Sequence, residues 1–164
     1  MKNANPLPDA VTDIHRRFHA FLTARVATPA LAERTLHAAY AHGSEEEHDL
    51  QDDEKIVPWF YKLVRTALDK TEYKRQGIDK ELKKLVGECV VDIVAMLKPD
   101  QAELIRKGEL AEKSLKDLAH QARTSPVDIR LRLHRAREAL KKKLMQALGA
   151  CVEHALMDCA CHRR

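Results

Sequence analysis

The chain has 164 residues, of which 45% are hydrophobic, 33% charged and only 4% aromatic, and its formal net charge is +4. The low aromatic content and the five glycines favour helices over strands, so the sequence predicts an all-α protein. No apolar run reaches the roughly 18 residues that a membrane span needs, and the polar N-terminal residues lack the apolar core of a secretory signal. We therefore expect a cytoplasmic protein that does not enter a membrane.

Two amphipathic helices are predicted in the first 45 residues. The apolar face of the first is formed by Val11, Ile14, Phe18, Phe21 and Leu22. Thr28 and Pro29 predict the start of the second, because they supply an N-cap and a proline at the first helical position. Gly43 is expected to end this helix.

An acidic stretch, residues 44–54, comes next and carries seven acids but no lysine or arginine. It can be a solvated loop, or it can mask a basic surface and oppose a phosphate backbone. A third helix is predicted after Pro58, with a stripe formed by Trp59, Leu63 and Ala67. For Trp59 and Tyr61, core packing is the leading interpretation and base stacking is the alternative.

A chain of this length can form one compact domain or two small helical lobes, and we expect the second arrangement. Residues 1–76 would form the N-terminal domain and residues 85–148 the C-terminal domain, with a short linker at residues 77–84. A Cys/His-rich tail, residues 149–164, would follow. Lobes of this size have thin cores and often need a partner.

Residues 114–144 are typical of a helix, a tight turn and a longer basic helix. Ser125 and Pro126 supply the cap and the first residue of the basic helix. Its apolar face is predicted to consist of Ile129, Leu133, Ala136 and Leu140, which leaves Arg130, Arg132, Arg135 and Arg137 mostly on the outer surface. Between Arg123 and Lys143 the chain has eight basic residues and two acids. Such a helix suits the major groove of DNA, with its flanks on phosphates. The alternative is a solvated basic face on an ordinary bundle helix.

The segment LAHQARTSPVDIRLRLHRAREAL resembles region 4, the C-terminal helix-turn-helix of RNA polymerase sigma factors of the extracytoplasmic function type. Their usual pattern is close to IAxxLGxSxGTVRSRLxRARxxL. WFYKLVRTALDKTEYKR is similar to the family's helix that engages the −10 element, and the two resemblances together cover most of residues 11–148. Arg123 replaces the family's turn glycine, so a strained positive φ is expected there. Val127 and Asp128 replace glycine and threonine, which predicts altered DNA contacts.

The resemblance implies a sigma factor that binds core RNA polymerase through the β′ clamp helices and the β flap and directs it to promoter DNA. An anti-sigma factor is a further candidate partner. The implied polymerase contacts are Glu33, Arg34, His37 and Tyr40. The implied DNA contacts are Lys62, Arg65, Arg75, Arg123, Ser125, Asp128, Arg130, Arg132, His134, Arg135 and Arg137.

The tail places four potential metal ligands within eleven residues: Cys151, His154, Cys159 and Cys161. Three thiolates and an imidazole can hold zinc in a tetrahedral site. Some sigma factors of this type carry similar cysteine-rich tails. Thiol redox chemistry is one alternative, and no special role is another.

Two other functions remain open. A sigma mimic would sequester an anti-sigma factor without opening promoters, and a stand-alone DNA-binding metal sensor would act without core polymerase. No nucleophile, base or phosphate-loop constellation is evident, so we do not expect an enzyme.

Overall fold

A computed structural model describes residues 9–45, 50 and 54–153. Its elements are α1 (Asp9–Arg25), α2 (Pro29–Ser44), α3 (Ile56–Asp69), α4 (Ile78–Val94), α5 (Pro99–Ile105), the π-helical turn η2 (Arg106–Leu110), α6 (Leu115–Gln121) and α7 (Pro126–Glu153). Only an isolated bridge between Val26 and Tyr73 has β geometry in this part of the chain. The prediction of an all-α fold is therefore confirmed.

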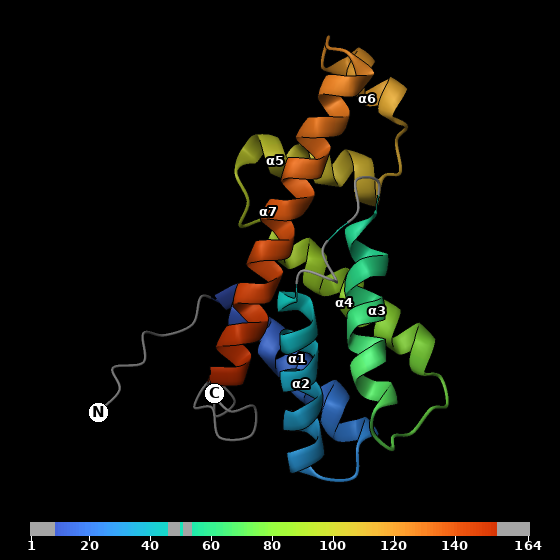
Figure 1. Ribbon diagram of the computed structural model, residues 1–164, viewed down its shortest axis with the longest axis vertical. Coiled ribbons are helices and arrows are strands. Elements are labelled where there is room, and N and C mark those ends of the chain that lie inside the picture. The colour runs from blue at the N-terminus through green and yellow to red at the C-terminus, as the bar shows by residue number, and fades with distance from the viewer. Residues whose placement is uncertain (1–8, 46–49, 51–53, 154–164) are drawn as a thin grey trace, which may run out of the picture.

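The molecule is elongated, and α7 runs along most of its length (Figure 1). One end of α7 lies beside α5 and α6, and the other lies beside α1 and α2. Its 28 residues correspond to about 42 Å of helix. A single helix thus connects the predicted helix-turn-helix with the N-terminal helices.

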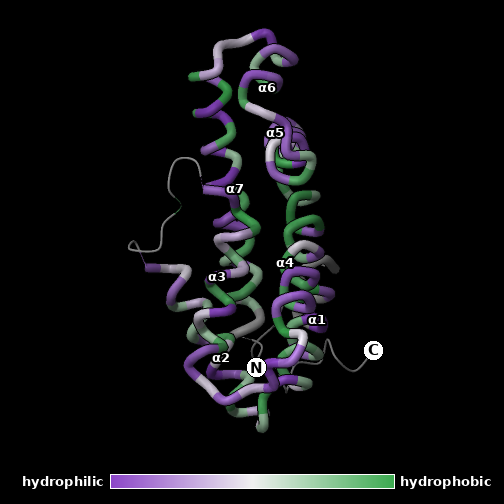
Figure 2. Tube along the Cα trace, turned by 90° about the vertical axis from the view of Figure 1, so that its right-hand side faces the viewer, coloured by the Kyte–Doolittle hydropathy of each residue, from purple (hydrophilic) through white to green (hydrophobic). Residues whose placement is uncertain are grey.

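A shared hydrophobic core includes buried side chains from every helix, α1 to α7. Figure 2 shows hydrophobic residues along the sides of the helices that face one another. Between α1 and α3, the rings of Phe18 and Phe60 meet edge to face, with centroids 6.1 Å apart. The predicted division into two lobes is not confirmed, because these residues form one contiguous cluster.

The predicted linker, residues 77–84, consists of Gly77 and the beginning of α4. Gly77 adopts a positive φ of 69°, and α4 begins at the next residue. Ile78 and Leu82 are both buried, so the apolar stripe of this helix starts earlier than the linker prediction allowed. Burial of these side chains fixes the segment against the core.

The C-terminal half of α7 packs closely on α2. Gly43 was expected to end α2, but the helix continues to Ser44 and Gly43 is buried inside it. A Cβ atom at Gly43 would overlap the Sδ and Cε atoms of Met145, and a Cβ at Gly149 would lie 2.9 Å from Cε2 of Tyr40. Two glycines therefore allow the two helices to approach each other.

Candidate nucleic-acid interface

The turn between α6 and α7 is a well-formed helix-turn-helix connection. Ser114 caps α6 by accepting a hydrogen bond of 3.1 Å from the Asp117 amide. At the other end, the Arg123 amide donates to His120 O (3.2 Å) and the Thr124 amide donates to Ala119 O (3.0 Å). This pair of bonds is the Schellman pattern, which uses a left-handed residue after the helix.

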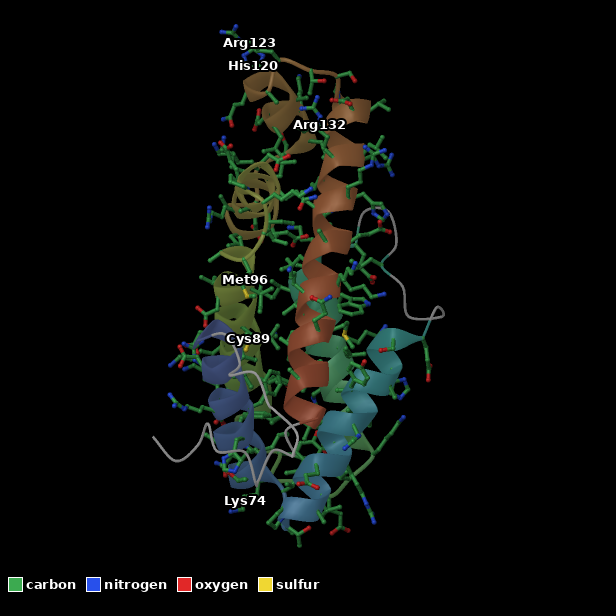
Figure 3. All side chains as sticks on the ribbon, turned by 90° about the vertical axis from the view of Figure 1, so that its left-hand side faces the viewer. Lys74, Cys89, Met96, His120, Arg123 and Arg132 are labelled. Carbon is green, nitrogen blue, oxygen red and sulfur yellow. The ribbon has the colours of Figure 1, made fainter. Side chains whose placement is uncertain are left out.

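Arg123 occupies the left-handed position of that turn, with φ of 53°. The positive φ predicted at this residue is thus confirmed. A side chain with a Cβ atom is strained in this conformation, whereas glycine is not. Figure 3 shows Arg123 and His120 at one extreme end of the molecule. Arg123 therefore has a strained backbone and also places a cation at this end of the molecule.

The first turn of α7 is held by Ser125 and Asp128. The Ser125 Oγ accepts a 3.1 Å hydrogen bond from the Asp128 amide, which is the predicted N-cap. The Asp128 carboxylate accepts 2.7 Å from the Thr124 hydroxyl and pairs with Arg132 Nε at 2.9 Å. Asp128, predicted as a DNA contact, is thus engaged in fixing the turn and Arg132.

Three arginines of α7 lie on its exposed surface: Arg130, Arg132 and Arg135. The nearby His134 is half-buried, and its Nε2 lies 3.1 Å from Glu138 Oε1. Ile129, Leu133 and Ala136 face the core instead. The start of α7 therefore presents cations outward and apolar side chains inward, as the sequence predicted.

Arg137 departs from that pattern, and its predicted place on the outer surface is wrong. The residue is buried, and its Nε lies 2.5 Å from Glu109 Oε1. Arg137 is one turn after the buried Leu133 and next to the buried Ala136, so helical geometry turns it toward the core. Its guanidinium is not available to DNA in this conformation.

A groove of about 540 Å³ lies between α5, α6 and the start of α7. Arg132 and Arg135 line one side, and Asp100 and Glu103 line the other. The Glu103 carboxylate accepts a 2.7 Å hydrogen bond from Lys107, which lowers the pKa of that carboxyl. Because the α5 side is acidic, the groove marks one edge of the basic surface.

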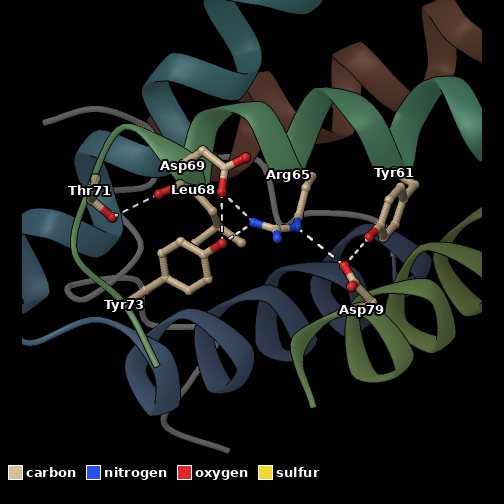
Figure 4. A network of polar contacts seen from close by, with 7 residues as sticks. All are labelled: Tyr61, Arg65, Leu68, Asp69, Thr71, Tyr73 and Asp79. Atoms are coloured by element: carbon tan, nitrogen blue, oxygen red, sulfur yellow. Dashed lines mark hydrogen bonds and ion pairs between the residues drawn. The ribbon is translucent and has the colours of Figure 1, made fainter. Parts of the chain in front are cut away.

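The predicted DNA contacts of α3 belong to a different network, which Figure 4 shows. Arg65 Nε donates to Asp79 Oδ1 at 3.2 Å, and Arg65 also contacts Asp69 and the Tyr73 hydroxyl. The Tyr61 hydroxyl donates to the same Asp79 oxygen. This network joins α3 to the beginning of α4.

These contacts shift the pKa of two of the groups. The hydrogen bond from Tyr61, followed by that from Arg65, lowers the pKa of the Asp79 carboxyl. Burial, together with the bond to Asp79, raises the pKa of Tyr61. Tyr61 is partly buried against the core and hydrogen-bonded, so its contacts here are those of packing and not of a free stacking platform.

The two sets of predicted DNA contacts lie apart. Lys62 is exposed on α3, and the guanidinium of Arg75 lies 4.8 Å from the centroid of the Tyr73 ring. Lys74, the neighbour of Arg75, is at the opposite end of the molecule from Arg123 (Figure 3). Arg75 and Arg123, one from each set, are therefore far apart along the molecule.

The predicted polymerase contacts lie together on α2. Arg34 and His37 are exposed and Glu33 is half-buried. Tyr40 is 37% exposed, and its ring approaches Gly149 of α7. Glu33, Arg34 and His37 therefore form an accessible strip. Tyr40 is also part of the packing between α2 and α7.

The four predicted metal ligands fall outside what can be described. His154, Cys159 and Cys161 follow the last described residue, and the side chain of Cys151 is likewise outside the described part. Most of the acidic stretch 44–54 is outside it too. Among the described residues, no group of three or more potential ligands is close enough to hold a metal ion. Cys89, the remaining cysteine, is buried in α4.

Sequence reasoning missed Glu109, the buried partner of Arg137. An acid within the stretch RKGEL gives no sign of burial by composition, because three charged residues surround the glycine. The π-helical turn changes the residue period at this point, so a helical wheel at 3.6 residues per turn misplaces Glu109. The only available signal was Arg137 itself, whose position in the apolar stripe called for an anionic partner.

Neither a scan against models of protein families nor searches of curated proteins and of solved structures found a match to this chain. Within the described residues, no helix is both long enough and apolar enough to cross a membrane.

Proposed function

We propose that the chain is a sigma factor that binds core RNA polymerase and directs it to promoter DNA. The observation that carries this proposal is the capped helix-turn-helix, whose second helix exposes Arg130, Arg132 and Arg135. A recognition helix of this kind docks in the major groove by its first turns. The order of the two sequence resemblances supports the same function.

Polymerase binding is assigned to α2, whose strip of Glu33, Arg34 and His37 is accessible. In the sigma reading this strip meets the β′ clamp helices, and the C-terminal part of the chain meets the β flap. Tyr40 would take part only where it extends beyond α7. Charged side chains at such a surface chiefly set the rate and specificity of association.

The test is binding and run-off transcription with purified core polymerase, on DNA from upstream of the protein's own gene. The double variant Arg130→Ala/Arg135→Ala should keep core binding but lose promoter-specific transcripts. The control is Lys80→Ala/Lys84→Ala, which removes two exposed cations from α4. A chain that binds no core polymerase and yields no specific transcript would refute the sigma function.

A stand-alone DNA-binding regulator is the second candidate. The shared core from α1 to α7 and the close packing of α2 on α7 favour it, because the N-terminal helices are occupied in supporting α7. Such a protein would protect a DNA site from cleavage without core polymerase. Protection that appears only when core polymerase is added would reject this candidate.

Control by zinc is proposed for the tail. Cys151, His154, Cys159 and Cys161 are a suitable donor set for tetrahedral zinc. Cys159→Ser/Cys161→Ser should lower the zinc bound per chain and remove any dependence of transcription on zinc. Equal zinc content and equal output in both proteins would contradict this role.

A further inference from the structure

Two apolar side chains lie on the outer surface at the start of α7. Val127 is 79% exposed and Leu131 is 48% exposed. They are one helical turn apart, so they lie on the same side of the helix. The buried residues Ile129 and Leu133 point to the opposite side.

Single exposed hydrophobic residues are common, but these two share their surface with cations. Arg130 lies between them in the sequence, and Arg132 and Arg135 are also exposed. The partner of this surface must therefore combine apolar groups with a high density of negative charge. An apolar protein surface would leave the guanidinium groups desolvated and without an anion, which is costly.

The major groove of DNA has this combination. The C5-methyl group of thymine is the apolar group on its floor, and phosphates line both of its edges. The first residues of a recognition helix are those that reach the base edges. Val127 and Leu131 occupy the first and second turns of α7.

We infer that Val127 and Leu131 contact the methyl groups of thymines, and so help to determine which DNA sequence α7 selects. This inference rests on the proposed binding of DNA by α7. Arg130, between the two, can form the paired hydrogen bonds to guanine O6 and N7 that arginine makes in the major groove. The selected element should thus combine thymines with guanine.

Asp128 has contacts within the chain that give it a role other than reading a base. Its carboxylate already accepts from the Thr124 hydroxyl at 2.7 Å and pairs with Arg132 at 2.9 Å. An acid that reads cytosine must accept a hydrogen bond from the N4 amino group of the base. The residue therefore orients the turn, while the apolar pair supplies the discrimination.

The experiment begins with selection of duplexes from a random-sequence library by the full-length chain with core polymerase. Each thymine of the selected element is then replaced by deoxyuridine, which keeps base pairing and removes only the methyl group. We expect one or two replacements to weaken binding about threefold to fourfold, the loss typical of one methyl contact. The remaining replacements should leave affinity unchanged.

Val127→Ala and Leu131→Ala should each abolish the preference for thymine over uracil at one position, so that the thymine and uracil duplexes bind with equal affinity there. Val91→Ala is the matched control, because Val91 is 52% exposed on α4. Circular dichroism confirms that the three variants fold. Equal affinity for thymine and uracil at every position would overturn the inference while leaving DNA binding intact. Selection that enriches no sequence would overturn the proposed function as well.

Discussion

Glu109 and Arg137 form an ion pair that is almost closed to solvent. Their side chains are 1% and 7% exposed, and Arg137 Nε lies 2.5 Å from Glu109 Oε1. The same oxygen accepts a 3.1 Å hydrogen bond from the amide of Ile56, at the first residue of α3. One carboxylate thus satisfies an unpaired amide at a helix N-terminus and holds η2, α3 and α7 together.

Removal of one partner of this pair should be strongly destabilising. Glu109→Ala or Arg137→Ala would leave a buried charge without its counter-ion, which typically costs about 3–5 kcal/mol. Urea unfolding followed by circular dichroism measures the loss. The double variant Glu109→Leu/Arg137→Leu should cost much less than the sum of the two single changes, because no charge stays buried. Additive losses would show that the two residues do not interact.

Arg123→Gly should stabilise the protein. Arg123 has a φ of 53°, where glycine is unstrained, so relief of strain should raise the free energy of unfolding by roughly 1 kcal/mol. The higher entropy of glycine in the unfolded chain reduces this gain. Arg123→Ala is the control, since it removes the same charge but keeps the Cβ atom. A gain as large with alanine would mean that charge, and not backbone conformation, limits stability.

Gly77 and Gly87 provide a second test of backbone conformation. A Cβ atom at either position would meet nothing within 4 Å, so the two sites differ chiefly in φ. Gly87→Ala, inside α4, should raise the free energy of unfolding by roughly 0.5–1 kcal/mol. Gly77→Ala, at φ of 69°, should lower it by about 1 kcal/mol. Changes of the same sign in the thermal unfolding of both variants would contradict this explanation.

Acid should weaken the contact between Tyr61 and Asp79. The pKa of Asp79 is lowered in the folded protein, first by the hydrogen bond from Tyr61. Its stabilisation is therefore present above the unfolded pKa, roughly 4, and is lost as the pH falls through the folded pKa. In Tyr61→Phe the fall of the melting temperature below that pH should be shallower than in the parent. Tyr40 has no carboxylate partner among the described contacts, so the melting temperature of Tyr40→Phe should fall with pH as steeply as that of the parent.

Alkaline pH should also weaken this contact, here through the titration of Tyr61. Burial raises the pKa of Tyr61, so its neutral form is favoured in the folded protein. The corresponding stabilisation is present below the unfolded pKa, roughly 10, and is lost as the pH rises through the folded pKa. Absorbance titration of tyrosinate should show one fewer late-titrating group in Tyr61→Phe.

Local signals in the sequence predicted the helix starts well. Thr28 before Pro29 and Ser125 before Pro126 each mark a helix N-terminus, and the structure places α2 and α7 at those residues. The positive φ of Arg123 was implied by the resemblance, in which this position is the turn glycine. The two helix starts depend on residues close in the chain, which is why sequence pattern alone sufficed for them.

Features that depend on distant residues were not predictable in this way. Arg137 was assigned to the surface because the apolar residues of the helix were expected to fill the core side, yet Glu109, 28 residues earlier, holds Arg137 in the core. The packing of α4 from Ile78 onward likewise depends on α1 and α3, which cover it. The exposure of Val127 and Leu131 also became clear only when the opposite side of α7 was seen to be filled.

Because α7 is one continuous helix, it holds the two ends of the molecule at a fixed separation. If the arginine-bearing end is seated on a duplex, the unbroken helix fixes how far away, and in which direction, α1 and α2 stand. One inserted base pair moves a neighbouring DNA element by about 3.4 Å and rotates it by roughly 35°. A chain built in this way would tolerate little variation in the spacing of two sites that it contacts at once.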